Sequence, residues 1–153
     1  MVHTETSRPT PAGTHEHAGH HTRPAVMWGL IVGVFNAAAP LAFWWLNAAT
    51  VHAMIVTLIA SVYIGFAVAD GRPHVIFTEC CVTAMFVIIA ASSITGTPWL
   101  LVLAYFAHGV KDLWQHRRQF VRGTRWWPPF CAAVDWLVAA VIAAEIVGGV
   151  GFR

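Results

Sequence analysis

Three residues that can bind a metal ion or move a proton lie four positions apart near the end of an apolar segment: His108, Asp112 and His116. Residues four apart in an α-helix are separated by only about 40° around the axis, so these side chains share one face of the predicted helix. Ionisable groups in a helix surrounded by lipid are rare and costly, and they usually mark function. We therefore expect the functional site on this face.

A bound metal ion is the first chemistry that these residue types support. Imidazole and carboxylate groups are ligands of Zn, Fe and Mn, and we assign His108, Asp112 and His116 as the metal ligands. Glu79 and Asp135 lie in other apolar segments. They are assigned as catalytic groups, which would complete the metal coordination or act as general base on a water molecule that the metal activates.

Two other interpretations of the same residues remain open. Carboxylates and histidines aligned across a membrane can relay protons or cations. Alternatively, the groups pair one to one, for example Asp112 with Lys111 and Asp135 with His108, and only lock the helices together. The pattern of residues alone does not separate a metal site, a relay and a structural lock.

The segments that carry these residues are apolar enough to cross a membrane. Of the 153 residues, 58% are hydrophobic and 10% are charged, whereas soluble domains average about 25% charged residues. One crossing takes about 20 apolar residues. The sequence therefore predicts an all-α integral membrane bundle of five transmembrane helices in one domain, residues 25–153, with spans at about 25–46, 51–69, 75–94, 99–116 and 126–147.

Residues 1–24 differ in composition from the rest of the chain. They are polar, rich in Pro, Thr and Gly, and without apolar periodicity. Such a segment buries too little apolar surface to order itself. We predict a disordered, His-rich cytoplasmic tail, whose histidines have no spacing that defines a metal site.

The basic residues predict an orientation for the five spans. Eight of the nine Lys and Arg residues fall on the side that also holds the amino terminus, and only Arg153 falls on the other. By the positive-inside rule, the amino terminus is cytoplasmic and the carboxyl terminus is outside. Lys111 and the Arg117–Arg125 loop are expected to contact anionic lipid headgroups of the bilayer. This topology explains the arginines, so we expect no nucleic-acid partner.

With this orientation, polar residues on four spans fall at similar depths. At about 1.5 Å per residue, they lie roughly 6 to 12 Å from the inner boundary: Tyr63, Glu79, His108, Asp112 and Asp135. We expect these side chains to converge. Tyr63 and Tyr105 are expected to orient the ligands by hydrogen bonds, because metal ligands are usually held by such partners.

Several short motifs resemble those of a group of short, uncharacterised bacterial multi-pass membrane proteins. The motifs are Tyr63-Ile64-Gly65-Phe66, the His-Gly-x-x-Asp-x-x-x-His pattern of residues 108–116, and Trp126-Trp127-Pro128-Pro129 followed by Asp135-Trp136. The resemblance covers roughly residues 50–148 and implies no activity. The preference for Arg over Lys, with many Ala and Val, resembles proteins of GC-rich bacteria such as actinobacteria, which implies the bacterial plasma membrane.

The leading functional hypothesis is a metal-dependent membrane enzyme that acts on a lipid-like substrate near the inner headgroups. A proton or cation relay and a non-catalytic structural protein are the alternatives. Whether the protein is an enzyme stays open at this point. The sequence indicates neither the substrate and reaction nor the oligomeric state.

Overall fold

The computed structural model describes residues 19–149, and these residues form six helices and no strand. The helices are α1 (Gly19–Ala37), α2 (Ala39–Ala42), α3 (Ala48–Asp70), α4 (Pro73–Thr95), α5 (Trp99–Arg118) and α6 (Trp127–Val147). The all-α prediction is confirmed. The tail prediction for residues 1–18 falls outside the described residues, as do residues 150–153.

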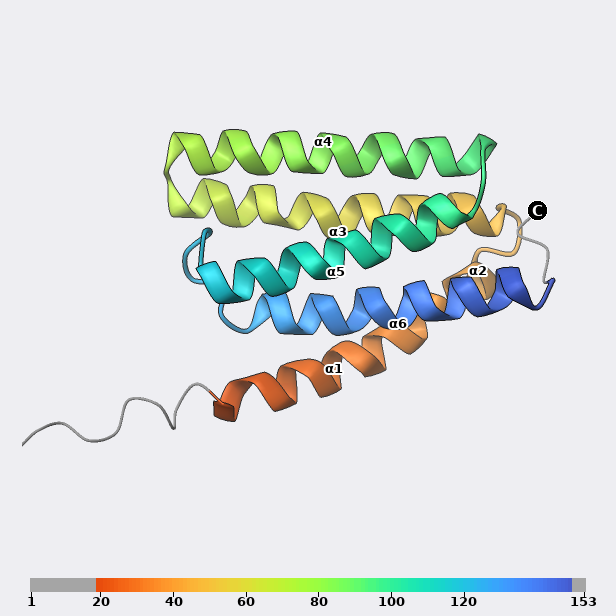
Figure 1. The fold of residues 1–153 in the computed structure, drawn as a ribbon, viewed down its shortest axis with the longest axis horizontal. Coiled ribbons are helices and arrows are strands. Elements are labelled where there is room, and N and C mark those ends of the chain that lie inside the picture. Colours follow the sequence, from red (N-terminus) through yellow and green to blue (C-terminus); the bar gives the residue numbers. More distant parts are fainter. Residues whose placement is uncertain (1–18, 150–153) are drawn as a thin grey trace, which may run out of the picture.

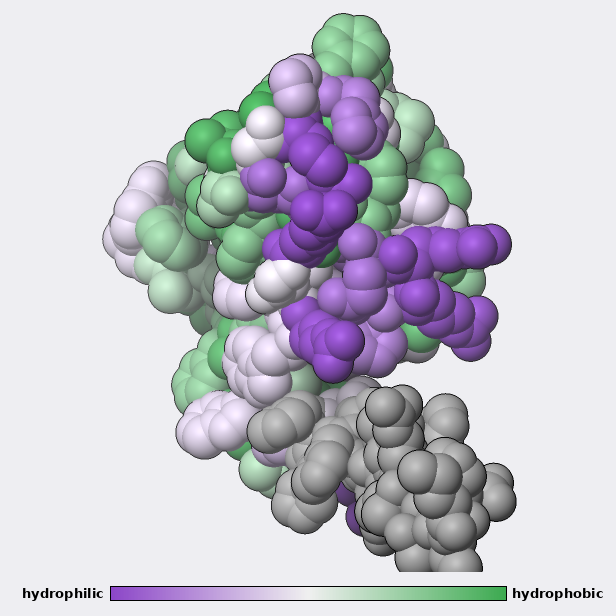
Figure 2. Space-filling view, turned by 90° about the vertical axis from the view of Figure 1, so that its left-hand side faces the viewer, coloured by the Kyte–Doolittle hydropathy of each residue, from purple (hydrophilic) through white to green (hydrophobic). Residues whose placement is uncertain are grey.

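The five long helices lie side by side (Figure 1). α3 and α4 form an antiparallel hairpin, α5 packs against this hairpin, α6 returns along α5, and α1 lies along α6. The α3–α4 turn, the α5–α6 loop and the start of α1 are at the same end of the molecule. We call this the arginine end, because five arginines lie in the turn, in the loop and in the last turn of α5: Arg72, Arg117, Arg118, Arg122 and Arg125. Figure 2 shows that hydrophilic residues gather on this end.

Three of the helices, α3, α4 and α6, are long and apolar enough to cross a membrane. They match the predicted spans 51–69, 75–94 and 126–147 to within a few residues. The protein is therefore a helical membrane protein. α1 and α5 do not meet the same length and composition test, because α1 begins with polar residues and α5 contains Lys111 and Asp112. Five crossings are thus not confirmed.

The first predicted span is not one continuous helix. α1 begins at Gly19, so residues 19–24 are helical rather than part of a disordered tail, and α1 ends at Ala37. Pro40 lies in the first turn of the short helix α2, where its missing N–H costs nothing. The chain then reaches Asn47, whose side chain accepts a hydrogen bond from the Ala49 N–H at 2.8 Å and caps α3.

Close packing of α1 on α6 depends on small residues. At Gly29, a Cβ atom would clash with the Phe130 carbonyl and lie 2.8 Å from the Ala133 Cβ. At Gly33, it would lie 3.3 Å from the Val134 Cα. Without a driving force from water, membrane helices associate through such close backbone contact. The repeat of Gly29 and Gly33 every four residues thus positions α1 against the outer side of α6.

Candidate metal centre

A glycine brings the two ligand-bearing helices together. A Cβ atom at Gly109 of α5 would overlap the indole of Trp136 on α6. The Trp136 Nε1–H also donates to the Phe106 carbonyl on α5, at 3.3 Å. Because Gly109 follows His108 and Trp136 follows Asp135, this close approach places the imidazole and the carboxylate within reach of each other.

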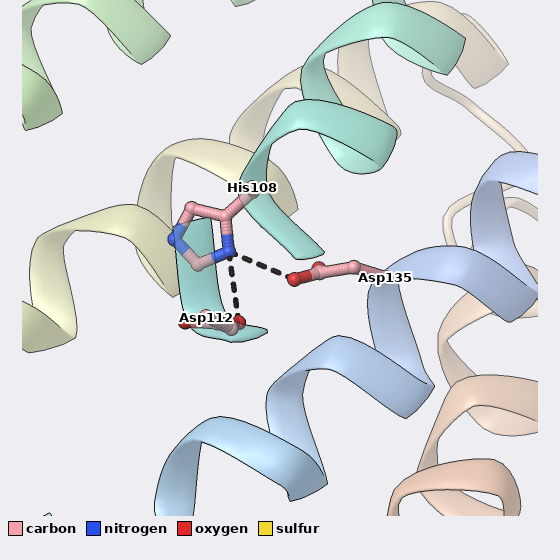
Figure 3. Close-up of side chains that lie close together, drawn as sticks. All are labelled: His108, Asp112 and Asp135. Carbon is pink, nitrogen blue, oxygen red and sulfur yellow. Dashed lines mark hydrogen bonds and ion pairs between the residues drawn. The ribbon is translucent and has the colours of Figure 1, made fainter. Parts of the chain in front are cut away.

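His108, Asp112 and Asp135 form a compact cluster between α5 and α6 (Figure 3). The His108 Nδ1 lies 2.8 Å from the Asp135 Oδ2 and makes a hydrogen bond with it. The same Nδ1 lies 3.4 Å from the Asp112 Oδ2. His108 and Asp112 are one turn apart on α5, so a single ring nitrogen faces two carboxylates, one from each helix.

The cluster is fully buried and its hydrogen-bonding capacity is not satisfied. The three side chains are 1% (His108), 0% (Asp112) and 0% (Asp135) exposed. Both Asp112 oxygens, the Asp135 Oδ1 and the His108 Nε2 are buried without a hydrogen-bond partner. A protonated His108 would balance only one of two ionised carboxylates. Buried charge is costly without compensation, so the cluster calls for a further positive charge, either a metal ion or a proton.

Aromatic rings from α3 and α4 close the other side of His108. Its imidazole makes edge contacts with Phe86, at 5.0 Å between ring centroids, and with Tyr63, at 6.1 Å. The Tyr63 hydroxyl is buried, and it interacts with the Asp112 carboxylate without reaching ordinary hydrogen-bond geometry. Tyr63 is therefore beside the cluster at the predicted depth, on the side of Asp112.

Glu79 is at the predicted level but is bound to another residue. Its Oε2 accepts a hydrogen bond from the Lys111 Nζ at 2.7 Å, and this ammonium also lies 3.2 Å from the centre of the Tyr63 ring. The Lys111 side chain is only 14% exposed. The pair neutralises itself, so Lys111 is not available to balance Asp112. Sequence reasoning missed this pair, although a lysine inside an apolar helix signals a buried acidic partner.

Two other predicted site residues lie outside the cluster. His116 lines an apolar groove between α1, α5 and α6, together with Leu30 and Leu137. The Tyr105 hydroxyl is buried and donates to the His52 carbonyl on α3 at 3.1 Å. Tyr105 therefore ties α5 to α3 rather than orienting a ligand.

The chemistry of the cluster fits a divalent metal ion. His108, Asp112 and Asp135 are the group of potential ligands found among the described residues, and one ligand atom from each lies within 4.8 Å of the others. Nitrogen and oxygen ligands lie about 2.0 to 2.2 Å from zinc. Two ligand atoms of one ion are therefore separated by at most about twice that distance, and the three atoms here are close to meeting this condition. One imidazole and two carboxylates suit Zn, Fe or Mn. The group could therefore hold such an ion, with Asp135 as a ligand in place of His116.

The arginine end is held by a different carboxylate. Asp70 accepts hydrogen bonds from the Arg72 Nε at 2.6 Å, the Arg72 Nη2 at 2.8 Å and the Arg122 backbone N–H at 2.8 Å. Arg72 also donates to the Phe120 carbonyl. Hydrogen bonding to Asp70 raises the pKa of the Arg72 guanidinium. This network joins the α3–α4 turn to the α5–α6 loop.

The chain matches no protein-family model, no curated protein and no solved structure.

Proposed function

We propose that this membrane protein binds a divalent transition-metal ion inside its helix bundle, through the His108 Nδ1 and the carboxylates of Asp112 and Asp135. The observation that carries the proposal is the set of three buried carboxylate oxygens that lack hydrogen bonds around one imidazole. A bound cation would supply the charge and the bonds that these oxygens lack. Such an ion would act there as a Lewis acid.

Metal binding has better support than catalysis on a lipid-like substrate. Three protein ligands leave a coordination position open, as catalytic sites require. However, His108, Asp112 and Asp135 are all at most 1% exposed, so a substrate would reach them only after the helices separate. Metal binding is therefore our conclusion, and lipid chemistry at this centre is the less supported extension.

A proton relay is the second candidate, and one observation favours it. The single His108 Nδ1 faces two carboxylates, an arrangement in which a proton rather than a metal ion could supply the missing charge. In vesicles containing the protein, a relay through Asp135 predicts a proton flux that the Asp135→Asn variant loses. An equal flux in both proteins would exclude this candidate.

We infer a topology of five crossings with a cytoplasmic amino terminus in a bacterial plasma membrane. α4 ends at the end opposite the arginine end, whereas α6 begins at the arginine end, and α5 joins them alongside both (Figure 1). If α4 and α6 cross the bilayer, α5 must cross as well. The arginine end then faces the cytoplasm by the positive-inside rule. A reporter fused after Arg153 that reads as cytoplasmic would contradict this orientation.

The metal proposal is tested by measuring Zn, Fe(II) and Mn(II) bound to the purified full-length protein. The five amino-terminal histidines (His3, His15, His17, His20 and His21) are replaced by Gln in every sample, so that they do not contribute to the bound metal. Deletion of residues 1–24 is avoided because α1 begins at Gly19. We expect an equimolar amount of one metal and more than about 100-fold weaker binding in Asp112→Asn and Asp135→Asn, since even partners of ligands contribute 10- to 100-fold.

A matched variant distinguishes the cluster from its neighbours. His116→Gln removes a group one turn from Asp112 that does not belong to the cluster, and this variant should retain the metal. Unchanged binding in Asp112→Asn, or loss of binding in His116→Gln, would overturn the assignment of the ligands.

A further inference from the structure

An apolar groove lies between α1 and α5, against α6. It has a volume of about 490 Å³, within the usual range of ligand sites. α1 contributes Val26 and Leu30, α5 contributes Leu113 and His116, and α6 forms the floor with residues that include Ala132. α1 and α5 both pack on α6, so the groove is the space that they leave between them.

The groove runs from the arginine end toward the middle of the bundle. Thr22, His116 and Pro129 line it near the start of α1, the end of α5 and the start of α6, whereas Leu30 and Leu137 line it farther in. These helix ends all lie at the arginine end (Figure 1). The groove therefore begins at the arginine end and continues toward the middle of the bundle, with an almost entirely apolar lining.

His116 is the only titratable residue among those that line the groove. Its Nδ1 is buried without a hydrogen-bond partner among the described residues. A buried polar atom costs free energy unless a partner satisfies it. Arg117 and Arg118 follow directly and are exposed. At the arginine end, the groove thus lies beside a buried imidazole nitrogen that lacks a partner and beside exposed positive charge.

We propose that this groove binds one anionic membrane lipid, with an acyl chain between α1 and α5 and the acidic headgroup at His116. The floor of the groove is α6, one of the three helices suited to cross the membrane, so the groove opens toward lipid chains rather than water. The arginines favour an anionic headgroup, and a phosphate oxygen would give the imidazole its hydrogen bond once the ring turns to expose its buried Nδ1. This site is independent of the metal centre.

The test uses the full-length protein in phosphatidylcholine vesicles with a trace of spin-labelled phosphatidic acid or, separately, spin-labelled phosphatidylcholine. Electron paramagnetic resonance measures the fraction of labelled chains whose motion is restricted by the protein. We expect the protein to prefer phosphatidic acid. His116→Phe keeps the aromatic ring but removes the nitrogen, and it should lower this preference about fivefold, the effect expected for the loss of one hydrogen bond.

A second histidine at the arginine end provides the control for the headgroup. His74 is on α4, packs against Phe120 and does not line the groove. His74→Phe should therefore keep the full preference for phosphatidic acid. If His116→Phe also keeps it, the preference comes from the arginines alone and the proposed headgroup contact is wrong.

Two valines of α1 test whether the chain occupies the groove. Val26 lines the groove and Val34 does not, and both are exposed, at 36% and 58%. Val26→Trp should fill the groove and reduce the restricted fraction of phosphatidic acid chains, whereas Val34→Trp should leave it unchanged. Equal effects of the two substitutions, or no restricted fraction in the unmodified protein, would overturn the proposal. The second result would also be expected if another part of the chain or a second copy filled the groove.

Discussion

Asp70 and Asp112 are both carboxylates with fully buried side chains, but their surroundings differ. Both Asp70 oxygens accept hydrogen bonds from Arg72 or the Arg122 backbone. Both Asp112 oxygens lack a hydrogen bond, and the nearest positive group is a histidine nitrogen that Asp135 already shares. Asp70, whose oxygens all accept hydrogen bonds, holds a turn and a loop together. Asp112, whose oxygens accept none, retains lone pairs for a ligand. Burial alone therefore does not distinguish a structural acid from a functional one.

The largest change in stability should come from breaking the pair of Glu79 and Lys111. Like Asp70, Glu79 accepts a hydrogen bond from a positively charged side chain. Lys111→Met leaves Glu79 buried without its cation, and loss of one partner of a buried pair costs about 3 to 5 kcal/mol. We expect this fall in the free energy of unfolding, measured by chemical denaturation in detergent micelles. The double variant Glu79→Leu with Lys111→Met should recover most of it. A double variant as unstable as the single one would show that the pair does more than neutralise its own charges.

A gain in the free energy of unfolding, rather than a loss, is expected from a substitution at Asp112. Asp112→Asn removes a buried charge whose positive neighbour, the His108 Nδ1 at 3.4 Å, also serves Asp135. The metal-free protein should therefore gain about 1 to 2 kcal/mol in the free energy of unfolding, as stabilising changes at functional sites often do. Asp135→Asn is the matched control, because it also weakens the 2.8 Å hydrogen bond to His108. Added metal should stabilise the unmodified protein and not the Asp112 variant. A loss of stability in metal-free Asp112→Asn would contradict the contrast with Asp70.

The smallest of the three effects is expected at Asp70. Asp70→Asn keeps the shape of the side chain but removes its charge, which should lower the thermal unfolding midpoint in the same micelles. The fall should be modest because the Arg72 side chain is 31% exposed and water can replace part of the interaction. Metal binding should not change. A variant that loses the metal would show that the arginine end and the candidate metal centre are coupled.

The sequence predicts the long helices well because their limits are set locally. Apolar runs end at turn residues such as Gly71 with Pro73 and Gly96 with Pro98, and α3 to α6 follow these runs closely. The predicted single helix over residues 25–46 is wrong. The apolar residues continue through Pro40, but α1 ends at Ala37 and a separate short helix follows. Hydrophobicity predicts burial in lipid, but the continuity of a helix depends on its backbone.

The sequence predicts the depth of the site along the helices but not which side chains form it. Depth along a helix follows from counting residues, and it correctly brings Asp135 to the level of His108. The direction in which a side chain points around the helix axis depends on how the helices pack. Two steps of four residues turn the helix by about 80° in total, so His108 and His116 cannot both face the same narrow contact with α6. The structure places His116 in the groove toward α1 instead.

The candidate centre lies at the contact between two groups of helices, α3 with α4 and α5 with α6. Each pair packs closely within itself, while the contact between the pairs is sparser. It is held by hydrogen bonds such as Tyr105 to His52, Lys111 to Glu79 and Arg122 to Asp70. Because the proposed ligands are at most 1% exposed, an ion would reach or leave them only after these contacts between the helix pairs separate. The time that such an ion stays bound would therefore depend on residues that do not touch it, and its affinity and exchange rate could change independently.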